Sequence, residues 1–239
     1  MIPTTARPLR RVERVMGTAI GFDVREPIDE EVVDRAFEFL RWVDRTFSVH
    51  RPDSEVSRIG RGELSGDDAC PQVREVLVRC CELREATDGW FDHEGGARRG
   101  RPLDPSGYVK GWSIDRSAER LGFEGAHSFC INAGGDVVAR GRPDGVDPWR
   151  VGIRDPQRPA EVPRIIGVAD AAVATSGSYE RGEHIWSPGK APRGSILSAT
   201  VVGPELATAD ALATAVFASG DARPGWWHRF PDYRLIVVG

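Results

Sequence analysis

Apolar residues recur with helical spacing in the first third of the chain. Asp29 can cap a helix that runs to about Thr46, and its apolar stripe consists of Val32, Val33, Ala36, Phe37, Leu40 and Val43. A second helix is predicted to begin at Pro71 and to stop at Asp88-Gly89. The stretch between them, residues 47 to 60, is crowded with polar groups and is interpreted as a short turn or a solvated loop.

Two further helices are predicted in the rest of the chain. One of these helices follows a turn that starts at Leu103, and this helix is predicted to end near Leu121-Gly122. The other is the run TADALATAVFASG, in which Thr208 can cap the start and Gly220 can end the helix. Within it we expect Asp210 to face solvent.

Strand patterns fill most of the remaining chain. The predicted strands are Met16 to Val24, Phe129 to Gly141 as strand, glycine turn and strand, Trp149 to Pro156, Ile165 to Thr175 as a strand pair, Ser195 to Val202 and Arg234 to Val238. Strands and helices do not alternate regularly, and no repeat is apparent. The order of elements therefore predicts an α+β fold.

Composition and charge narrow the class of protein. The chain has 239 residues, 40% of them apolar and 28% charged, and a net charge of -4, as in an ordinary soluble globular protein. No basic excess indicates nucleic acid as a partner. The arginines near the N-terminus precede no apolar run, and no stretch is long enough to span a membrane, so we expect a cytoplasmic protein without a membrane anchor. The four cysteines are interpreted as reduced packing residues.

Asp210 and Thr214 are the first candidates for chemistry. Residues four apart share a helix face, so a carboxylate and a hydroxyl at the first turns of this helix can hold a hard cation such as Mg²⁺. The alternative is structural: the aspartate favours the positive end of the helix dipole, and the threonine bonds back to a carbonyl.

Other polar stretches allow a similar choice. The glycine turn at residues 132 to 136 allows a phosphate to approach the backbone, but it also suits a plain hairpin. Residues 95 to 102, GGARRGRP, are predicted to form an exposed loop whose arginines either meet phosphates or are merely solvated. The hydroxyl-rich run from Thr175 to Pro188 holds His184, which alone is typical of a surface histidine.

Nine motifs in a fixed order give a more specific indication. They are MGT at Met16, FSxxxxxSExSR from Phe47, DG-x-FD from Asp88, D-x-x-G-x-x-KG from Asp104, NAGGD from Asn132, W-x-VGI-x-DP from Trp149, ATSGSYER from Ala174, HIWSP from His184 and ADALATAVFASG from Ala209. In this order the chain resembles the ApbE family, the FAD:protein FMN transferases, over roughly residues 12 to 222.

The resemblance implies a fold and an activity. The expected fold is an ApbE-like, T-fold-like arrangement of mixed antiparallel sheets with packed helices, in a single domain over residues 1–239. The implied reaction binds FAD with Mg²⁺, cleaves the pyrophosphate and transfers FMN to a serine or threonine of an acceptor flavoprotein, releasing AMP.

The resemblance also implies roles for individual residues. The metal ligands would be Asp210, Thr214 and the carbonyl of Gly107, and His184 would activate the acceptor. The FAD-binding residues would be Met16, His50, Trp90, Phe91, Asp92, Asp104, Lys110, Asn132, Gly134, Gly135, Asp136, Thr175 and Ser176.

The chain departs from the family pattern at three places. His50 stands where members usually carry a tyrosine, Ser187 replaces the usual aspartate of the histidine motif, and the segment between Asp92 and Asp104 is short. Two alternatives to transfer therefore stay open, which are an FAD pyrophosphatase and a non-catalytic FAD-binding protein.

Overall fold

A seven-stranded antiparallel sheet forms the centre of the computed structural model, which describes residues 8–94, 103–158, 161–162, 164–177 and 196–239. Its strand order is β1-β2-β3-β4-β7-β8-β9, and β5 pairs with β6 in a separate small sheet. The strands are β1 (Leu9–Val15), β2 (Thr18–Val24), β3 (Phe129–Ala133), β4 (Asp136–Arg140), β5 (Trp149–Ile153), β6 (Arg164–Val168), β7 (Ala171–Gly177), β8 (Ser198–Gly203) and β9 (Arg234–Val238).

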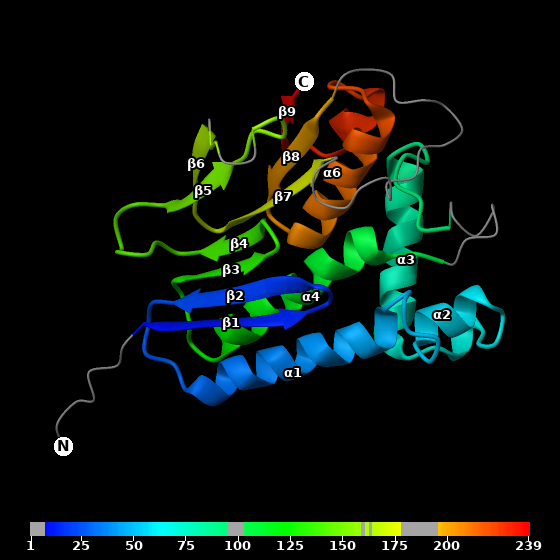
Figure 1. The fold of residues 1–239 in the computed structure, drawn as a ribbon, viewed down its shortest axis with the longest axis horizontal. Coiled ribbons are helices and arrows are strands. Elements are labelled where there is room, and N and C mark those ends of the chain that lie inside the picture. The colour runs from blue at the N-terminus through cyan, green and yellow to red at the C-terminus, as the bar shows by residue number, and fades with distance from the viewer. Residues whose placement is uncertain (1–7, 95–102, 159–160, 163, 178–195) are drawn as a thin grey trace.

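The helices cover the large sheet and carry much of the core (Figure 1). They are α1 (Glu30–Phe47), α2 (Glu55–Gly60), α3 (Pro71–Ala86), α4 (Ser106–Phe123) and α6 (Leu206–Ser219), with short 3-10 turns at η1 (Gly66–Asp68) and η3 (Gly225–Arg229). Helix α6 packs against β7, β8 and β4, α4 contacts α6 and β3, and α1 contacts α4 and β1. The result is the α+β architecture expected from the sequence.

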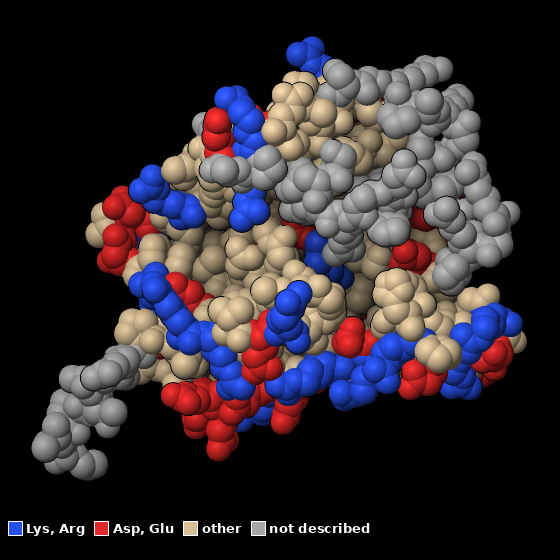
Figure 2. All heavy atoms as spheres, in the orientation of Figure 1, with Lys and Arg blue, Asp and Glu red and all other residues tan. Residues whose placement is uncertain are grey.

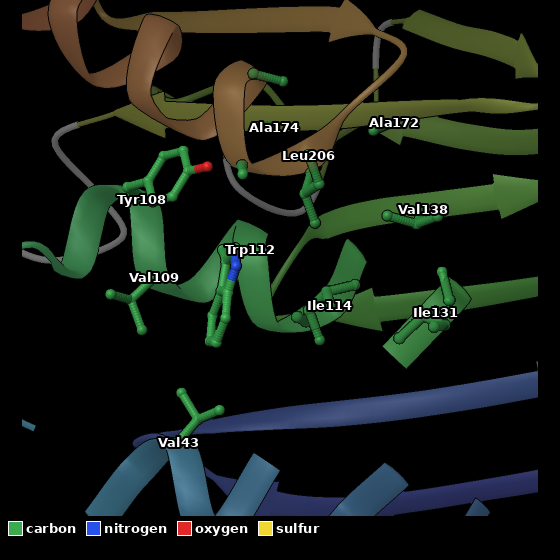
Figure 3. Packing of buried hydrophobic residues seen from close by; sticks show 14 of the residues in the cluster. Val43, Tyr108, Val109, Trp112, Ile114, Ile131, Val138, Ala172, Ala174 and Leu206 are labelled. Atoms are coloured by element: carbon green, nitrogen blue, oxygen red, sulfur yellow. The ribbon is translucent and has the colours of Figure 1, made fainter. Parts of the chain in front are cut away.

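The contact between α4 and α6 lies at the middle of the core. A β-carbon at Gly111 of α4 would lie 2.6 Å from the Cα of Ala207 and from the carbonyl oxygen of Leu206, so only glycine allows this approach. Figure 3 shows Leu206 of α6 and Trp112 of α4 in the same core as Val43 of α1. The two helices are therefore fixed closely relative to each other.

Helix α6 receives its N-terminal cap from another helix. Asp115 of α4 accepts hydrogen bonds from the backbone N–H groups of Leu206, at 3.0 Å, and Ala207, at 2.8 Å. These are orphan donors of the first turn, and a carboxylate there also suits the helix dipole. Thr208 was expected to cap the helix, and this is wrong, because it lies inside the first turn and its hydroxyl donates to Glu205. Gly220 does end the helix, in the left-handed conformation with φ 62.

The first strand of the chain was not expected. Met16 to Val24 was predicted as one strand, but Met16 and Gly17 form a turn with positive φ, and β1 precedes it. β1 does not show the usual apolar-in pattern, because Val12 is 68% exposed while Glu13 faces α1 and pairs with Arg41 at 2.6 Å. The inward positions of β1 thus combine the partly buried, ion-paired side chains of Arg11 and Glu13 with the apolar side chains of Leu9 and Val15.

Three other expectations need correction. The turn after α1 contains the short helix α2, which Ser54 caps by accepting from the Ser57 N–H at 3.0 Å. β6 and β7 are strands, but β6 pairs with β5 and β7 pairs with β4 and β8, so they are not partners of each other. Cys81 is exposed and is not a packing residue, although Cys80 is buried and all four thiols are free.

The charged surface is mixed in sign on the face shown in Figure 2. Acidic and basic side chains alternate along the edge formed by β1 and α1, and the middle of this face is mostly uncharged. Within the described part of the chain, no helix combines the length and apolar character needed to cross a membrane.

Candidate functional site

Four elements bring the predicted site residues together near the start of α6. Asp136 is the first residue of β4, Thr175 and Ser176 lie near the end of β7, Lys110 lies in the second turn of α4, and Asp210 lies in the second turn of α6. Because β4 and β7 are neighbours in the sheet, the Thr175 N–H donates to Asp136 Oδ1 at 3.0 Å. Residues far apart in sequence thus meet at one place.

Lys110 joins the two carboxylates of this place. Its ammonium forms a close ion pair with Asp136 Oδ2 and lies 3.5 Å from Asp210 Oδ2. Asp136 and Asp210 are buried, with side-chain exposures of 1% and 5%, and Lys110 is largely buried, with 13%. Burying charges is costly unless they are paired, and here both carboxylates lie close to the ammonium of Lys110. Asp210 was expected to face solvent, and that is wrong, since α6 is enclosed by α4 and the sheet.

Hydroxyl groups of β7 and α6 lie close to each other and to the start of α4. Thr214, one turn after Asp210, has its Oγ1 3.4 Å from Ser176 Oγ. A β-carbon at Gly107 would lie 3.5 Å from the same Thr214 oxygen and 3.3 Å from Phe91 Cε2. The start of α4 therefore lies directly against Thr214. We call Gly107, Lys110, Asp136, Ser176, Asp210 and Thr214 the α4–α6 cluster.

The donor atoms of the α4–α6 cluster suit a hard cation. They are carboxylate and hydroxyl oxygens, which Mg²⁺ prefers, and Mg²⁺ commonly uses few protein ligands and completes its shell with water and phosphate. Among the described residues, no group of three or more histidine, cysteine or acidic side chains is placed to hold a metal ion. The described residues therefore suit a magnesium ion whose remaining ligands come from water and a phosphate group. They suit a fully protein-ligated structural metal site less well.

Two other carboxylates predicted to bind FAD have partners close to them in the sequence. Asp104 is exposed and accepts from the Ser106 N–H at 3.0 Å, which tightens the turn into α4. Asp92 accepts from the Glu94 N–H at 3.0 Å and lies 3.4 Å from Arg84 Nε. These contacts give both carboxylates a structural function in their own turns.

The glycine turn and the turn of the N-terminal hairpin also make specific contacts within the protein. Asn132 accepts from the Gly135 N–H at 3.0 Å, and Gly134 and Gly135 have φ of 64 and 107, so the turn needs glycine for conformational reasons. Met16 places its sulfur 3.9 Å from the hydroxyl of Ser113 in α4. The turn of the first hairpin therefore reaches the helix that carries Lys110.

The aromatic candidates differ in exposure. Phe91 is buried at 3%, Trp90 is half-buried, and His50 is exposed on the loop between α1 and α2. His184 and the arginines of residues 95 to 102 lie outside the described residues, so their predicted roles stay predictions.

Two residues of the site were not found by sequence reasoning. Asp115 and Gly111 fix α4, which carries Lys110, against the start of α6, which carries Asp210. The signal for Gly111 was present, since it follows Lys110 in the D-x-x-G-x-x-KG motif, but it gave no partner. Asp115 had no signal of its own, because its partners are backbone groups about 90 residues away.

The sequence of this chain is similar to those of known proteins. A family model described as the ApbE family matches residues 16–98 and 94–234. A FAD:protein FMN transferase of Vibrio cholerae is 36% identical over 135 residues, covering 51% of this chain and 40% of that protein. Another from Chlamydia trachomatis is 26% identical over 274 residues, covering 89% and 83%. This chain spans less than half the length of the first curated relatives that it matches.

The fold is also similar to a solved structure. The flavin transferase ApbE from Vibrio cholerae superposes with a TM-score of 0.81 at 24% sequence identity, over 96% of each chain. This similarity concerns the fold, and it confirms the expected ApbE-like α+β arrangement.

Proposed function

The chain belongs to the ApbE family, and on that premise we propose that it transfers the FMN half of FAD to a serine or threonine hydroxyl of an acceptor flavoprotein, releasing AMP. The observation that carries the proposal is the α4–α6 cluster, in which Asp210 and Thr214 lie beside Gly107 and Lys110. Buried charges of both signs at one place are typical of a site that handles charge, rather than of a plain helix contact.

Asp210, Thr214 and the Gly107 carbonyl would hold a magnesium ion. Such an ion, when bound, neutralises charge that develops on phosphate oxygens during transfer. Lys110 adds a fixed positive charge next to the same place, and the buried setting strengthens its attraction for a phosphate. The other residues proposed to line the FAD site are Met16, His50, Trp90, Phe91, Asp92, Asp104, Asn132, Gly134, Gly135, Thr175 and Ser176.

The proposed reaction exchanges the phosphoanhydride bond of FAD for a phosphoester bond to the acceptor. The acceptor hydroxyl oxygen bonds to the phosphorus of the FMN half, the bond from that phosphorus to the AMP oxygen breaks, and AMP leaves. The hydroxyl proton passes to His184, which acts as the general base. With Ser187 where the family has an aspartate, no carboxylate is present at that position to orient the imidazole, so we expect a weaker base.

Mass spectrometry tests this function directly. The purified protein is incubated with FAD and Mg²⁺, with and without a peptide that carries the motif Asp-x-x-Ser/Thr-Gly-Ala-Ser/Thr. The proposal expects a peptide that carries FMN, together with free AMP. Free FMN and AMP with an unmodified peptide would instead indicate an FAD pyrophosphatase, and recovery of intact FAD would indicate a binding protein.

A further inference from the structure

Asp136 has both carboxylate oxygens engaged by the protein itself. Its Oδ1 accepts from the Thr175 N–H at 3.0 Å, and its Oδ2 is the close partner of Lys110. With 1% of its side chain exposed, Asp136 has little surface to offer a ligand. Its contacts instead point to an action on Lys110.

Lys110 is shared unequally between the two carboxylates. Its ammonium is closer to Asp136 than to Asp210, from which it is separated by 3.5 Å. That distance exceeds the usual length of a charge-assisted N–H···O bond, about 2.7–2.9 Å. The attraction of Asp136 therefore opposes the movement of Lys110 onto Asp210.

We propose that Asp136 is a positioning residue that holds the Lys110 ammonium back from Asp210 and so keeps the Asp210 carboxylate available to a divalent cation. The inference rests on the proposed function, because it takes Asp210 as a cation ligand. An ammonium in direct contact with Asp210 would compete with the cation for the same oxygen and would repel it at short range. Asp136 thus sets cation affinity without touching the cation.

Cation binding to the whole protein tests this role without relying on turnover. Mn²⁺ serves as the probe, and free Mn²⁺ is followed by electron paramagnetic resonance during titration. Asp136→Asn keeps an oxygen for the Thr175 N–H but removes the charge that holds Lys110. We expect it to weaken Mn²⁺ binding roughly tenfold or more, because Lys110 then pairs with Asp210.

A second substitution separates positioning from a general structural effect. Adding Lys110→Met to Asp136→Asn removes the competing ammonium, so we expect Mn²⁺ affinity to return to within about threefold of the parent, a difference under 1 kcal/mol. Glu119→Gln is the matched control, because it also removes one negative charge, but from the exposed far end of α4, the helix that carries Lys110. We expect this control to bind Mn²⁺ like the parent.

The outcomes distinguish the inference from the proposed function. A parent protein that binds no Mn²⁺ would contradict both. Parent-like binding in Asp136→Asn, or no recovery in the double variant, would overturn the inference and leave the cation site intact. If Asp136→Asn does not fold, Lys110→Met alone decides: binding at least as tight as in the parent supports the inference, and weaker binding overturns it.

Discussion

Asp115 and Asp210 are acidic residues of the same helix pair, but their partners differ. Asp115 accepts from two backbone N–H groups at the start of α6, whereas Asp210 lies near an ammonium that it shares with Asp136. Backbone donors cannot leave, so Asp115 is fixed in a structural role. A side-chain cation can be moved or joined by another ion. The partner of such a carboxylate, more than its burial, therefore distinguishes the structural acid Asp115 from Asp210, which we propose to bind a cation.

The largest effect is expected from removing His184, the proposed general base, which belongs to neither of the two compared carboxylates. His184→Ala should lower FMN transfer by roughly 10²–10⁴-fold, because a positioned general base commonly contributes that much. FAD affinity, measured by calorimetry, should hardly change. Normal transfer by this variant would mean that His184 is not the base, and that the cluster and proximity suffice.

Removing the Asp115 carboxylate should lower the stability of the fold. Asp115→Ala leaves two N–H groups at the start of α6 without their acceptor, and we expect the free energy of unfolding to fall by about 2–3 kcal/mol. Urea denaturation measures this change. Mn²⁺ affinity of the folded variant should stay within a few-fold of the parent, and a collapse of cation binding at unchanged stability would reverse the assignment.

The pH dependence of the free energy of unfolding also tests the structural role of Asp115. Burial raises the pKa of Asp115 from its ordinary value of 3.8 to about 6, in spite of the two N–H donors that oppose the shift. The folded protein therefore binds a proton more tightly than the unfolded chain, so this contribution is present below about pH 4 and is lost as the pH rises through about 6.

Asp115→Asn removes the titrating group and provides the reference. Between about pH 4 and pH 6, the stability of the parent relative to this variant should decline by up to about 3 kcal/mol. Chemical denaturation at several pH values measures the difference. Parallel pH profiles for parent and variant would show that Asp115 does not titrate in this range.

The smallest expected effect concerns the spacing of the two helices. Gly111→Ala forces a β-carbon against the Ala207 backbone, which should cost about 1–3 kcal/mol of unfolding free energy. Gly122→Ala in the same helix is the matched control, because a β-carbon there meets nothing within 4 Å. It should leave the melting temperature unchanged or slightly raise it. Equal melting temperatures would show that the contact is not tight.

Local patterns predicted the helices well, because caps, breakers and apolar stripes are written within one segment. Asp29, Pro71 and Gly220 all mark ends that the structure confirms. β1 was missed because two of its inward side chains, Arg11 and Glu13, form ion pairs with α1, which interrupts the apolar alternation that marks a strand. The order of the motifs indicated the site residues, but the pairing of Lys110 with Asp136 and Asp210 depends on sheet topology and helix packing, which single segments do not encode.

The most direct test of the proposed cation site compares Asp210→Asn with the parent in the mass-spectrometric transfer assay over a range of Mg²⁺ concentrations. The substitution keeps the size of the buried side chain, so circular dichroism should show an intact fold. We predict that FMN transfer falls at least about 100-fold, roughly 3 kcal/mol in transition-state stabilisation, and is not recovered at high Mg²⁺. Transfer within a few-fold of the parent, with the same Mg²⁺ dependence, would contradict the claim that Asp210 holds the cation.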